Sequence, residues 1–248
     1  MSTIEETLKR LAITFTVRDI MVPEVGLTCA GDEIEAAIVS KDNPDFNVIP
    51  LRQNTKLTGY FLRDSRTSRE IVLSDLISDG TSLLDLVEIF EDREFSFVLS
   101  YREIAGYVHF SDLNHHLVKL TFYVILEALE RQALNSIPRK DDREYLSKNL
   151  DPSRFAQIDR QYKRDGDAAR SLFNYLNISD ILRLAVKAGM IQLDDNVIKA
   201  MKDIRDGAAH ASENIVADYE SVKRLAMVKR ECLRILAEHR GFSSAARA

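Results

Sequence analysis

The first half of the chain alternates short hydrophobic runs with turn-forming residues. Helical spacing of apolar positions over residues 4–12 predicts a short amphipathic helix, and residues 14–19 begin an extended segment. Residues 30–39 are typical of a turn followed by a helix, with acidic side chains in the first turn that complement the helix dipole. Residues 46–51 and 57–61 then predict two short strands. This half is therefore expected to mix helices and strands.

The same order of elements returns further along the chain. Residues 79–85 predict a second turn into a helix, and residues 95–99 and 104–108 predict a second pair of strands. A Gly-Tyr dipeptide occurs in both pairs, and its glycines, Gly59 and Gly106, are 47 residues apart. A repeat at a fixed period indicates an internal duplication of one helix-and-hairpin unit.

Helical spacing dominates the second half of the chain. Residues 111–136 contain no Gly or Pro and carry apolar residues on nearly every face, so this helix is expected to be central in a bundle or at a subunit interface. Apolar spacing predicts four further helical segments over residues 142–164, 168–188, 194–204 and 211–239. Gly207 marks a junction between the last two. The second half is expected to be all-helical.

The doubled unit resembles the tandem CBS-domain module, in which each copy runs strand, helix, strand, strand, helix. The resemblance covers about residues 14–113 and is carried by residues 17–21, 46–51 and 106–113. It implies an α+β pair that holds an adenine nucleotide in the cleft between its copies. The regulatory ligand would be ATP, ADP, AMP or a related signalling nucleotide.

The same resemblance implies nucleotide-binding residues in the segment that begins at Gly106. Asp112 matches the acidic residue that accepts hydrogen bonds from ribose hydroxyls, and His109 occupies the place of a Thr or Ser that faces the phosphate. The matching positions of the first copy are Ser65 and Leu62, so at most one site is expected. Alternatively, Asp112 is a first-turn helix residue stabilised by the helix dipole.

Three arginines, Arg63, Arg66 and Arg69, fall where the closing helix of the first copy is expected. Together they could meet a polyphosphate, because guanidinium groups match phosphate geometry. A solvated loop is the more common explanation for such a charge cluster. Both interpretations remain open from the sequence.

Composition and charge favour two domains. The 248 residues are 45% hydrophobic and 29% charged, with a formal net charge of −5. Residues 1–113 are net acidic and residues 114–248 net basic, which suggests a domain boundary near residue 113. By the resemblance, the first domain would be a nucleotide-sensing module, and the second is expected to be helical. The basic half is the better partner for a polyanion, although a solvated helical surface also explains its charge.

Other sequence features bear on the compartment. Only two cysteines, Cys29 and Cys232, are present and far apart, so no disulfide framework or zinc knuckle is indicated. The first residues lack the apolar core of a secretory signal, and no apolar run is long enough to span a membrane. A cytoplasmic protein without a membrane partner is expected.

The candidate catalytic residues are Arg205, Asp206 and His210. Arginine binds phosphate, and histidine can take and give a proton near neutral pH. Spacing alone does not select this pair, because Arg234 and His239 are also five positions apart. Within one regular helix, positions five apart point about 140° away from each other. A break at Gly207 would re-aim Arg205 and His210, which favours the first pair.

Residues 114–240 resemble a HEPN domain, a helical fold of RNA-cleaving effectors and of inactive partners. The feature that carries the resemblance is Arg205, the polar Asp206 and then His210 near the start of a long terminal helix. It implies a metal-independent endoribonuclease in which two such motifs meet across a homodimer, here controlled by the nucleotide. Two alternatives remain: a non-catalytic regulatory or interaction module, such as an antitoxin or regulatory subunit, and a purely structural dimer.

Overall fold

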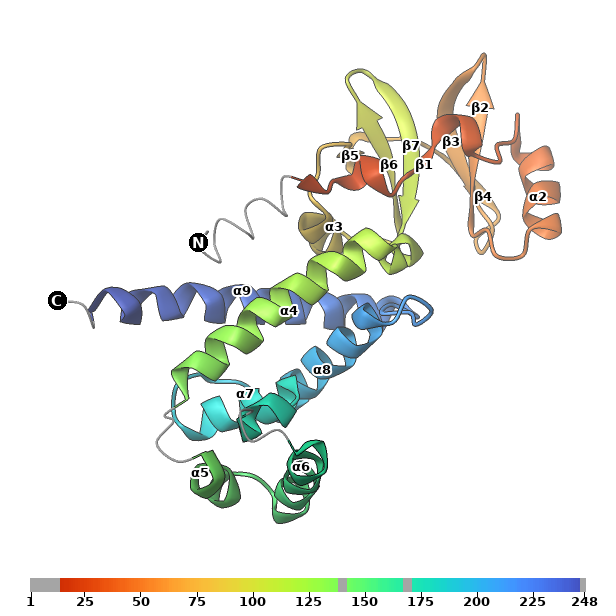
Figure 1. The fold of residues 1–248 in the computed structure, drawn as a ribbon. Helices are drawn as coiled ribbons and strands as arrows, with labels where there is room; N and C mark the ends of the chain where they lie inside the picture. Colours follow the sequence, from red (N-terminus) through yellow and green to blue (C-terminus); the bar gives the residue numbers. More distant parts are fainter. Residues whose placement is uncertain (1–13, 138–141, 167–170, 246–248) are drawn as a thin grey trace. The chain divides into compact units, whose positions relative to one another are not determined.

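The computed structural model describes residues 14–137, 142–166 and 171–245. They form two compact units, one ending at Leu117 and the other beginning at Val118 (Figure 1). The first is a mixture of helices and strands, and the second is helical. The predicted domain boundary after residue 113 falls inside the 3-10 helix η4 (Phe110–Asn114). The helix predicted over residues 4–12 lies outside the described residues.

Two β-hairpins dominate the N-terminal unit. One is formed by β2 (Val48–Gln53) and β3 (Lys56–Leu62), the other by β6 (Phe95–Ser100) and β7 (Glu103–His109). Their registers match at the 47-residue offset: the first pairs Val48 with Leu62, and the second pairs Phe95 with His109. Both hairpins also slip register at matching positions, after Leu51 and after Val98. The predicted duplication is therefore confirmed down to the strand register.

The outer strands repeat in the same way. β4 (Thr67–Glu70) runs antiparallel beside β3, and the short β1 (Val22–Pro23) runs antiparallel beside β7. The parallel pairing of β5 (Leu76–Ser78) with β6 has its counterpart in an isolated bridge between Ala30 and Leu51. The two sheets, β2-β3-β4 and β1-β7-β6-β5, are thus built to one plan.

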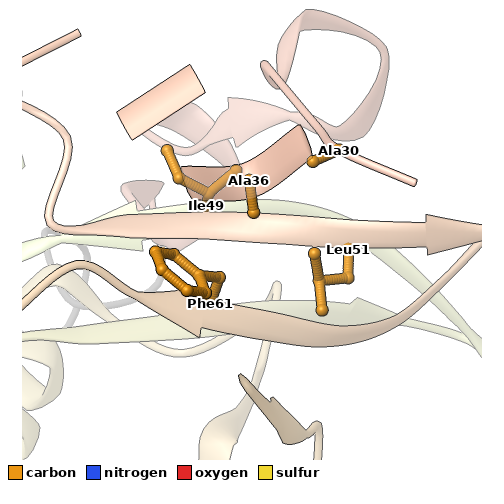
Figure 2. Close-up of a cluster of buried hydrophobic side chains, with 5 residues drawn as sticks. All are labelled: Ala30, Ala36, Ile49, Leu51 and Phe61. Carbon is orange, nitrogen blue, oxygen red and sulfur yellow. The ribbon is translucent and has the colours of Figure 1, made fainter. Parts of the chain in front are cut away.

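One helix accompanies each hairpin. α2 (Glu33–Asp42) begins after Asp32, whose side chain accepts the Glu35 backbone N–H, and α3 (Leu83–Ile89) begins after Ser82. The buried cluster between α2 and its sheet is drawn in Figure 2 and consists of Ala30, Ala36, Ile49, Leu51 and Phe61. Alternation along the strands places Val48 and Tyr60 on the opposite face, where they pack with Phe97 of the second sheet.

The closing helix expected in the first copy is absent, and that prediction is wrong. Arg63 and Arg66 lie in the turn after β3, Arg66 with a left-handed φ of 53°, and Arg69 lies in β4. Only residues 63–66 separate β3 from β4, and four residues leave no length for a helix.

The helical unit contains six α-helices within the described residues: α4 (His116–Ser136), α5 (Asp142–Asn149), α6 (Pro152–Asp165), α7 (Ile178–Lys187), α8 (Asp195–Ala209) and α9 (Tyr219–Ala245). The capping residues follow sequence rules. Asp151, Asn177 and Asp194 cap α6, α7 and α8 through their side chains. α4 buries one wide face, whereas Leu120 on the same helix is 45% exposed.

The predicted break at Gly207 is also wrong, because α8 continues to Ala209. Gly207 is buried, and a Cβ there would be 3.1 Å from the Ile215 side chain. The missing side chain thus makes room for the loop that follows α8. Packing of that loop offsets the roughly 1 kcal/mol by which glycine disfavours a helix interior.

Candidate functional site

The candidate site of the helical unit is built on α4 and α8. The guanidinium carbon of Arg205, near the end of α8, is 5.6 Å from the centroid of the Tyr123 ring on α4. One guanidinium nitrogen, Nη2, is 3.8 Å from Oε2 of Glu130, also on α4. Tyr123 and Glu130 are seven positions apart, about two helical turns, so they share one side of α4. The guanidinium group of Arg205 lies along that side.

The N–H donors of Arg205 make no hydrogen bond within the described residues. The contacts to Glu130 at 3.8 Å and to Asp206 Oδ1 at 4.0 Å are charge contacts beyond hydrogen-bond length. The side chain is 33% exposed. Its planar fork of five donors is therefore held by charge and by an aromatic face while remaining available to an anion.

Glu130 is a mostly buried carboxylate. Its side chain is 19% exposed, and Oε2 is buried without a hydrogen-bond partner among the described residues. Burial raises the pKa of Glu130, an effect that the positive charge of Arg205 opposes and the negative charge of Glu127 reinforces. Sequence reasoning missed both Tyr123 and Glu130. The available signal was an ionisable residue within an otherwise apolar helix.

Asp206 lies between two cations. Its Oδ2 accepts a hydrogen bond of 2.7 Å from Lys202 Nζ, one helical turn earlier, and its Oδ1 is the atom 4.0 Å from Arg205. The side chain is 43% exposed. Asp206 therefore forms its hydrogen bond with Lys202, and its negative charge also lies close to Arg205.

His210 is the residue at which α8 ends, and it is exposed. Because α8 is unbroken through Ala209, the re-aiming of Arg205 and His210 by a helix break does not occur. Arg205 lies within α8, whereas His210 is its C-cap, with extended backbone angles (φ −106°, ψ 118°). The two residues belong to one end of the helix, but no helical repeat relates their side chains.

Lys119 of α4 anchors the loop that carries His210. The lysine is 5% exposed, and its Nζ donates to the backbone oxygens of Ala211 at 3.0 Å and Glu213 at 2.5 Å. Both carbonyls lie in the connection between α8 and α9. The position of the backbone just after His210 is therefore fixed by a buried ammonium group.

Arg234, the arginine of the second spacing match, is fully engaged. It donates to the carboxylates of Glu231 and Glu238 and to the backbone oxygen of Gln192. These contacts tie α9 to the connector before α8, which is a structural role. The side chain of His239 lies outside the described part of the structure. Arg205, in contrast, has N–H donors without a hydrogen bond among the described residues. This difference between the two arginines, rather than their spacing to a histidine, makes Arg205 the better candidate to bind an anion.

In the N-terminal unit, Asp112 and His109 cap the 3-10 helix η4. Asp112 Oδ2 accepts the His109 backbone N–H at 2.8 Å, and His109 Nδ1 accepts the Ser111 backbone N–H at 3.2 Å. Burial raises the pKa of Asp112, partly offset by the bond from His109, and burial lowers the pKa of His109. The two predicted nucleotide-binding side chains are thus brought together, and each has a local structural task.

Gly106 lies inside β7, and its lack of a side chain is explained by its neighbour strand. A Cβ there would lie 2.5 Å from the backbone oxygen of Val22 in β1. Gly59 is equivalent in the first copy, where a Cβ would lie 2.6 Å from the Arg69 oxygen in β4. The repeated glycine is therefore required by close strand approach, whatever its relation to a ligand.

An open groove of about 1050 Å³ runs beside α2, lined on its other side by Phe61 and by the turn with Arg63 and Arg66. On α2 itself, Ile34 is 75% and Ile38 is 57% exposed. The arginines that sequence analysis linked to a polyphosphate thus border a groove whose helix side is apolar.

Metal-ligand clusters and membrane spans are both missing from the described residues. No group of three or more His, Cys, Asp or Glu side chains there could hold a metal ion. No helix among the described residues is both long and apolar enough to cross a membrane.

Comparison with known proteins gives partial structural similarity only. No family model matches the chain, and no curated protein sequence matches it. The CBS domain of the bacterial CNNM/CorC family Mg²⁺ transporter in complex with ATP is 14% identical, with 46% of this chain and 94% of that chain covered and a TM-score of 0.36. A functionally unknown conserved protein domain from Neisseria meningitidis MC58 is 18% identical, with coverages of 43% and 82% and a TM-score of 0.35. Function is therefore inferred from this chain's own residues and contacts.

Proposed function

We propose that this chain is a metal-independent endoribonuclease whose helical unit cuts RNA and whose N-terminal unit binds a regulatory adenine nucleotide. The observation that carries the proposal is Arg205, a guanidinium placed against Tyr123 with its donors uncommitted among the described residues. Such a group suits the non-bridging oxygens of a phosphodiester, where charge grows during cleavage.

The chemistry uses the 2′-hydroxyl of RNA as an internal nucleophile. As a base removes its proton, the 2′-oxygen bonds to phosphorus and the 5′-oxygen leaves with a proton from an acid. The products are a 2′,3′-cyclic phosphate and a 5′-hydroxyl. His210 would transfer a proton, Arg205 would stabilise the phosphate charge, and Asp206 would support Arg205 electrostatically.

The proposed active form is a homodimer. One copy supplies one candidate catalytic histidine, His210, whereas the reaction uses both an acid and a base. Arg205 lies within α8 and His210 at its C-cap, so a single α8 supplies one of each group. Two copies of α8 facing each other would supply both groups, Arg205 of one beside His210 of the other.

Regulation is proposed through the N-terminal unit, with an adenine nucleotide held by Asp112, His109 and the backbone near Gly106. The duplicated sheets provide two related surfaces, and the Asp112 and His109 side chains cap a helix at only one of them. Their counterparts in the first copy are Ser65 and Leu62. A single nucleotide per chain is therefore expected.

The enzyme is tested by incubating labelled RNA with the purified chain in the presence of EDTA, with and without ATP, ADP or AMP. Arg205→Ala and His210→Ala should each abolish the cleavage that wild type shows. His116→Ala is the matched control, because it removes another exposed histidine outside the proposed site. Equal, background-level cleavage by wild type and His210→Ala under every condition would refute the enzyme.

The nucleotide site is tested separately by thermal shift. Adenine nucleotide should raise the melting temperature of wild type, and Asp112→Asn should abolish this rise. Asparagine keeps an oxygen that can accept the His109 N–H, so the cap of η4 survives while the charge is removed. No shift with any of the three nucleotides would exclude the sensor function.

A second candidate is a non-catalytic regulatory or interaction module, such as an antitoxin or regulatory subunit. The observation favouring it is that, within one chain, Arg205 lies close to two carboxylates, Glu130 and Asp206. A nucleotide-dependent thermal shift in a chain that cuts no RNA would select this alternative.

A further inference from the structure

The Glu130 carboxylate has an unusual electrostatic position. Removing a carboxylate from water costs several kcal/mol unless hydrogen bonds or opposite charges replace the lost hydration. Glu130 Oε2 has no hydrogen-bond partner among the described residues, and its nearest cation is Arg205, at 3.8 Å. Arg205 is therefore the main compensation for this buried charge.

This compensation conflicts with phosphate binding. A phosphate that forms hydrogen bonds with the guanidinium group draws positive charge away from Glu130 and adds negative charge near it. The phosphate and the Glu130 carboxylate would then be two negative charges beside the same guanidinium group, and they repel strongly where water is largely excluded. Because Glu130 is only 19% exposed, solvent screens that repulsion poorly. Binding a phosphate at Arg205 must therefore overcome a cost set by Glu130.

We propose that Glu130 is an internal counterion that competes with an RNA phosphate for the Arg205 guanidinium and so limits how tightly the chain binds RNA. The inference rests on the proposed RNA-binding role of Arg205. Glu130 acts through Arg205 and is a positioning residue, holding the guanidinium along α4 until a stronger anion replaces the carboxylate.

Competition of this kind couples RNA binding to protonation. The charged groups that face Glu130 are Arg205 from α8 and Glu127 from its own helix. Burial already raises the pKa of Glu130, and loss of Arg205 to a phosphate removes the influence that lowers it. Phosphate binding should therefore be accompanied by proton uptake at Glu130, so affinity should rise as pH falls, by up to about tenfold per pH unit.

The test measures binding of the full chain to a fluorescent 2′-O-methyl oligonucleotide by anisotropy. This probe lacks the nucleophilic hydroxyl and so reports binding without cleavage. Glu130→Gln should bind about three- to tenfold more tightly than wild type at neutral pH, with a weaker dependence on pH. The matched control is Glu127→Gln, which removes the same charge one turn earlier from a carboxylate that pairs with Arg131. It should change affinity by less than about twofold.

Two further variants complete the test. Arg205→Ala should weaken binding, and Glu130→Gln should have no effect on that background. Glu130→Asp, whose shorter side chain lies further from Arg205, should bind with intermediate affinity and serves if the glutamine variant does not fold. Circular dichroism checks the fold of each variant.

The outcomes separate this inference from the proposed enzyme. Binding that depends on Arg205 and strengthens in Glu130→Gln supports the competition even if wild type cuts no RNA, which would refute the nuclease alone. The competition is overturned if Glu130→Gln binds no more tightly than Glu127→Gln, if its effect persists without Arg205, or if neither wild type nor Glu130→Gln binds the oligonucleotide at any pH.

Discussion

Replacing Gly106 with alanine should destabilise the N-terminal unit because β1 leaves no room for a Cβ. The added carbon would lie 2.5 Å from the Val22 backbone oxygen and 2.9 Å from the Met21 sulfur. Ordinary contact begins at 3.4 Å, so β1 and β7 must separate locally by about 0.9 Å. Gly59→Ala meets the same obstacle at 2.6 Å from the Arg69 oxygen, and both changes should therefore behave alike.

The expected magnitude follows from two opposing contributions. Overpacking against a backbone atom costs about 1–3 kcal/mol, whereas replacing glycine restricts the unfolded chain and contributes about 0.4–1 kcal/mol in the opposite direction. A net loss of about 1–2 kcal/mol in the free energy of unfolding is expected for Gly106→Ala. Gly80→Ala is the control, because its Cβ would meet only the Ser78 hydroxyl at 3.6 Å.

Urea unfolding of the full chain, followed by circular dichroism, measures these differences. If Gly106→Ala and Gly59→Ala were no less stable than Gly80→Ala, close strand approach would not be the reason for the repeated glycine. A large loss at one glycine alone would contradict the structural equivalence of the two copies. The measurement also separates a structural Gly106 from one needed only for nucleotide binding, since no nucleotide is present.

Three further changes test other parts of the fold. Lys119→Met should lower the free energy of unfolding by about 1–3 kcal/mol, because two loop carbonyls lose a charged donor; Lys202→Met, at a surface ion pair, should cost under about 1 kcal/mol, and equal losses in urea unfolding would contradict the anchor. Arg154→Ala should cost about 3–5 kcal/mol in the same assay, because the Asp180 carboxylate, 7% exposed, loses its partner; a loss below about 1 kcal/mol would refute this. Burial lowers the pKa of His109, so the unfolded chain binds a proton first and wild type should lose stability as pH falls below about 6.5, whereas His109→Asn should lack this contribution; parallel pH profiles would count against it.

Sequence patterns predicted the repeated part of the fold well, because that part is governed by local rules. Strand alternation and the Gly-Tyr dipeptide located both hairpins, and the offset between Gly59 and Gly106 gave their common register. The error in this part, the closing helix expected in the first copy, came from the family resemblance, in which each copy ends in a helix, and not from the local pattern. Only residues 63–66 lie between β3 and β4. This segment is long enough for a turn but too short for a helix.

The break predicted at Gly207 failed for a different reason. Glycine weakens a helix by only about 1 kcal/mol, and tertiary packing readily exceeds that cost. The contact with Ile215, which explains the glycine, comes from a loop whose return path is not encoded in the local pattern of α8. A glycine in a sequence therefore marks either a break or a close contact, and the spacing of its neighbours does not distinguish the two.

The candidate site shows what local patterns omit. Arg205, Asp206 and His210 were found because they are close in sequence, but the groups that determine the behaviour of Arg205 come from α4, far earlier in the chain. Tyr123 supplies an aromatic face and Glu130 a competing charge, and neither belongs to any motif. A lysine or glutamate within an apolar helix is costly to bury, so each such residue requires a partner elsewhere. Lys119 and Glu130 both find that partner at the end of α8 or just beyond it, so the two buried charges of α4 are the sequence signal that links these helices.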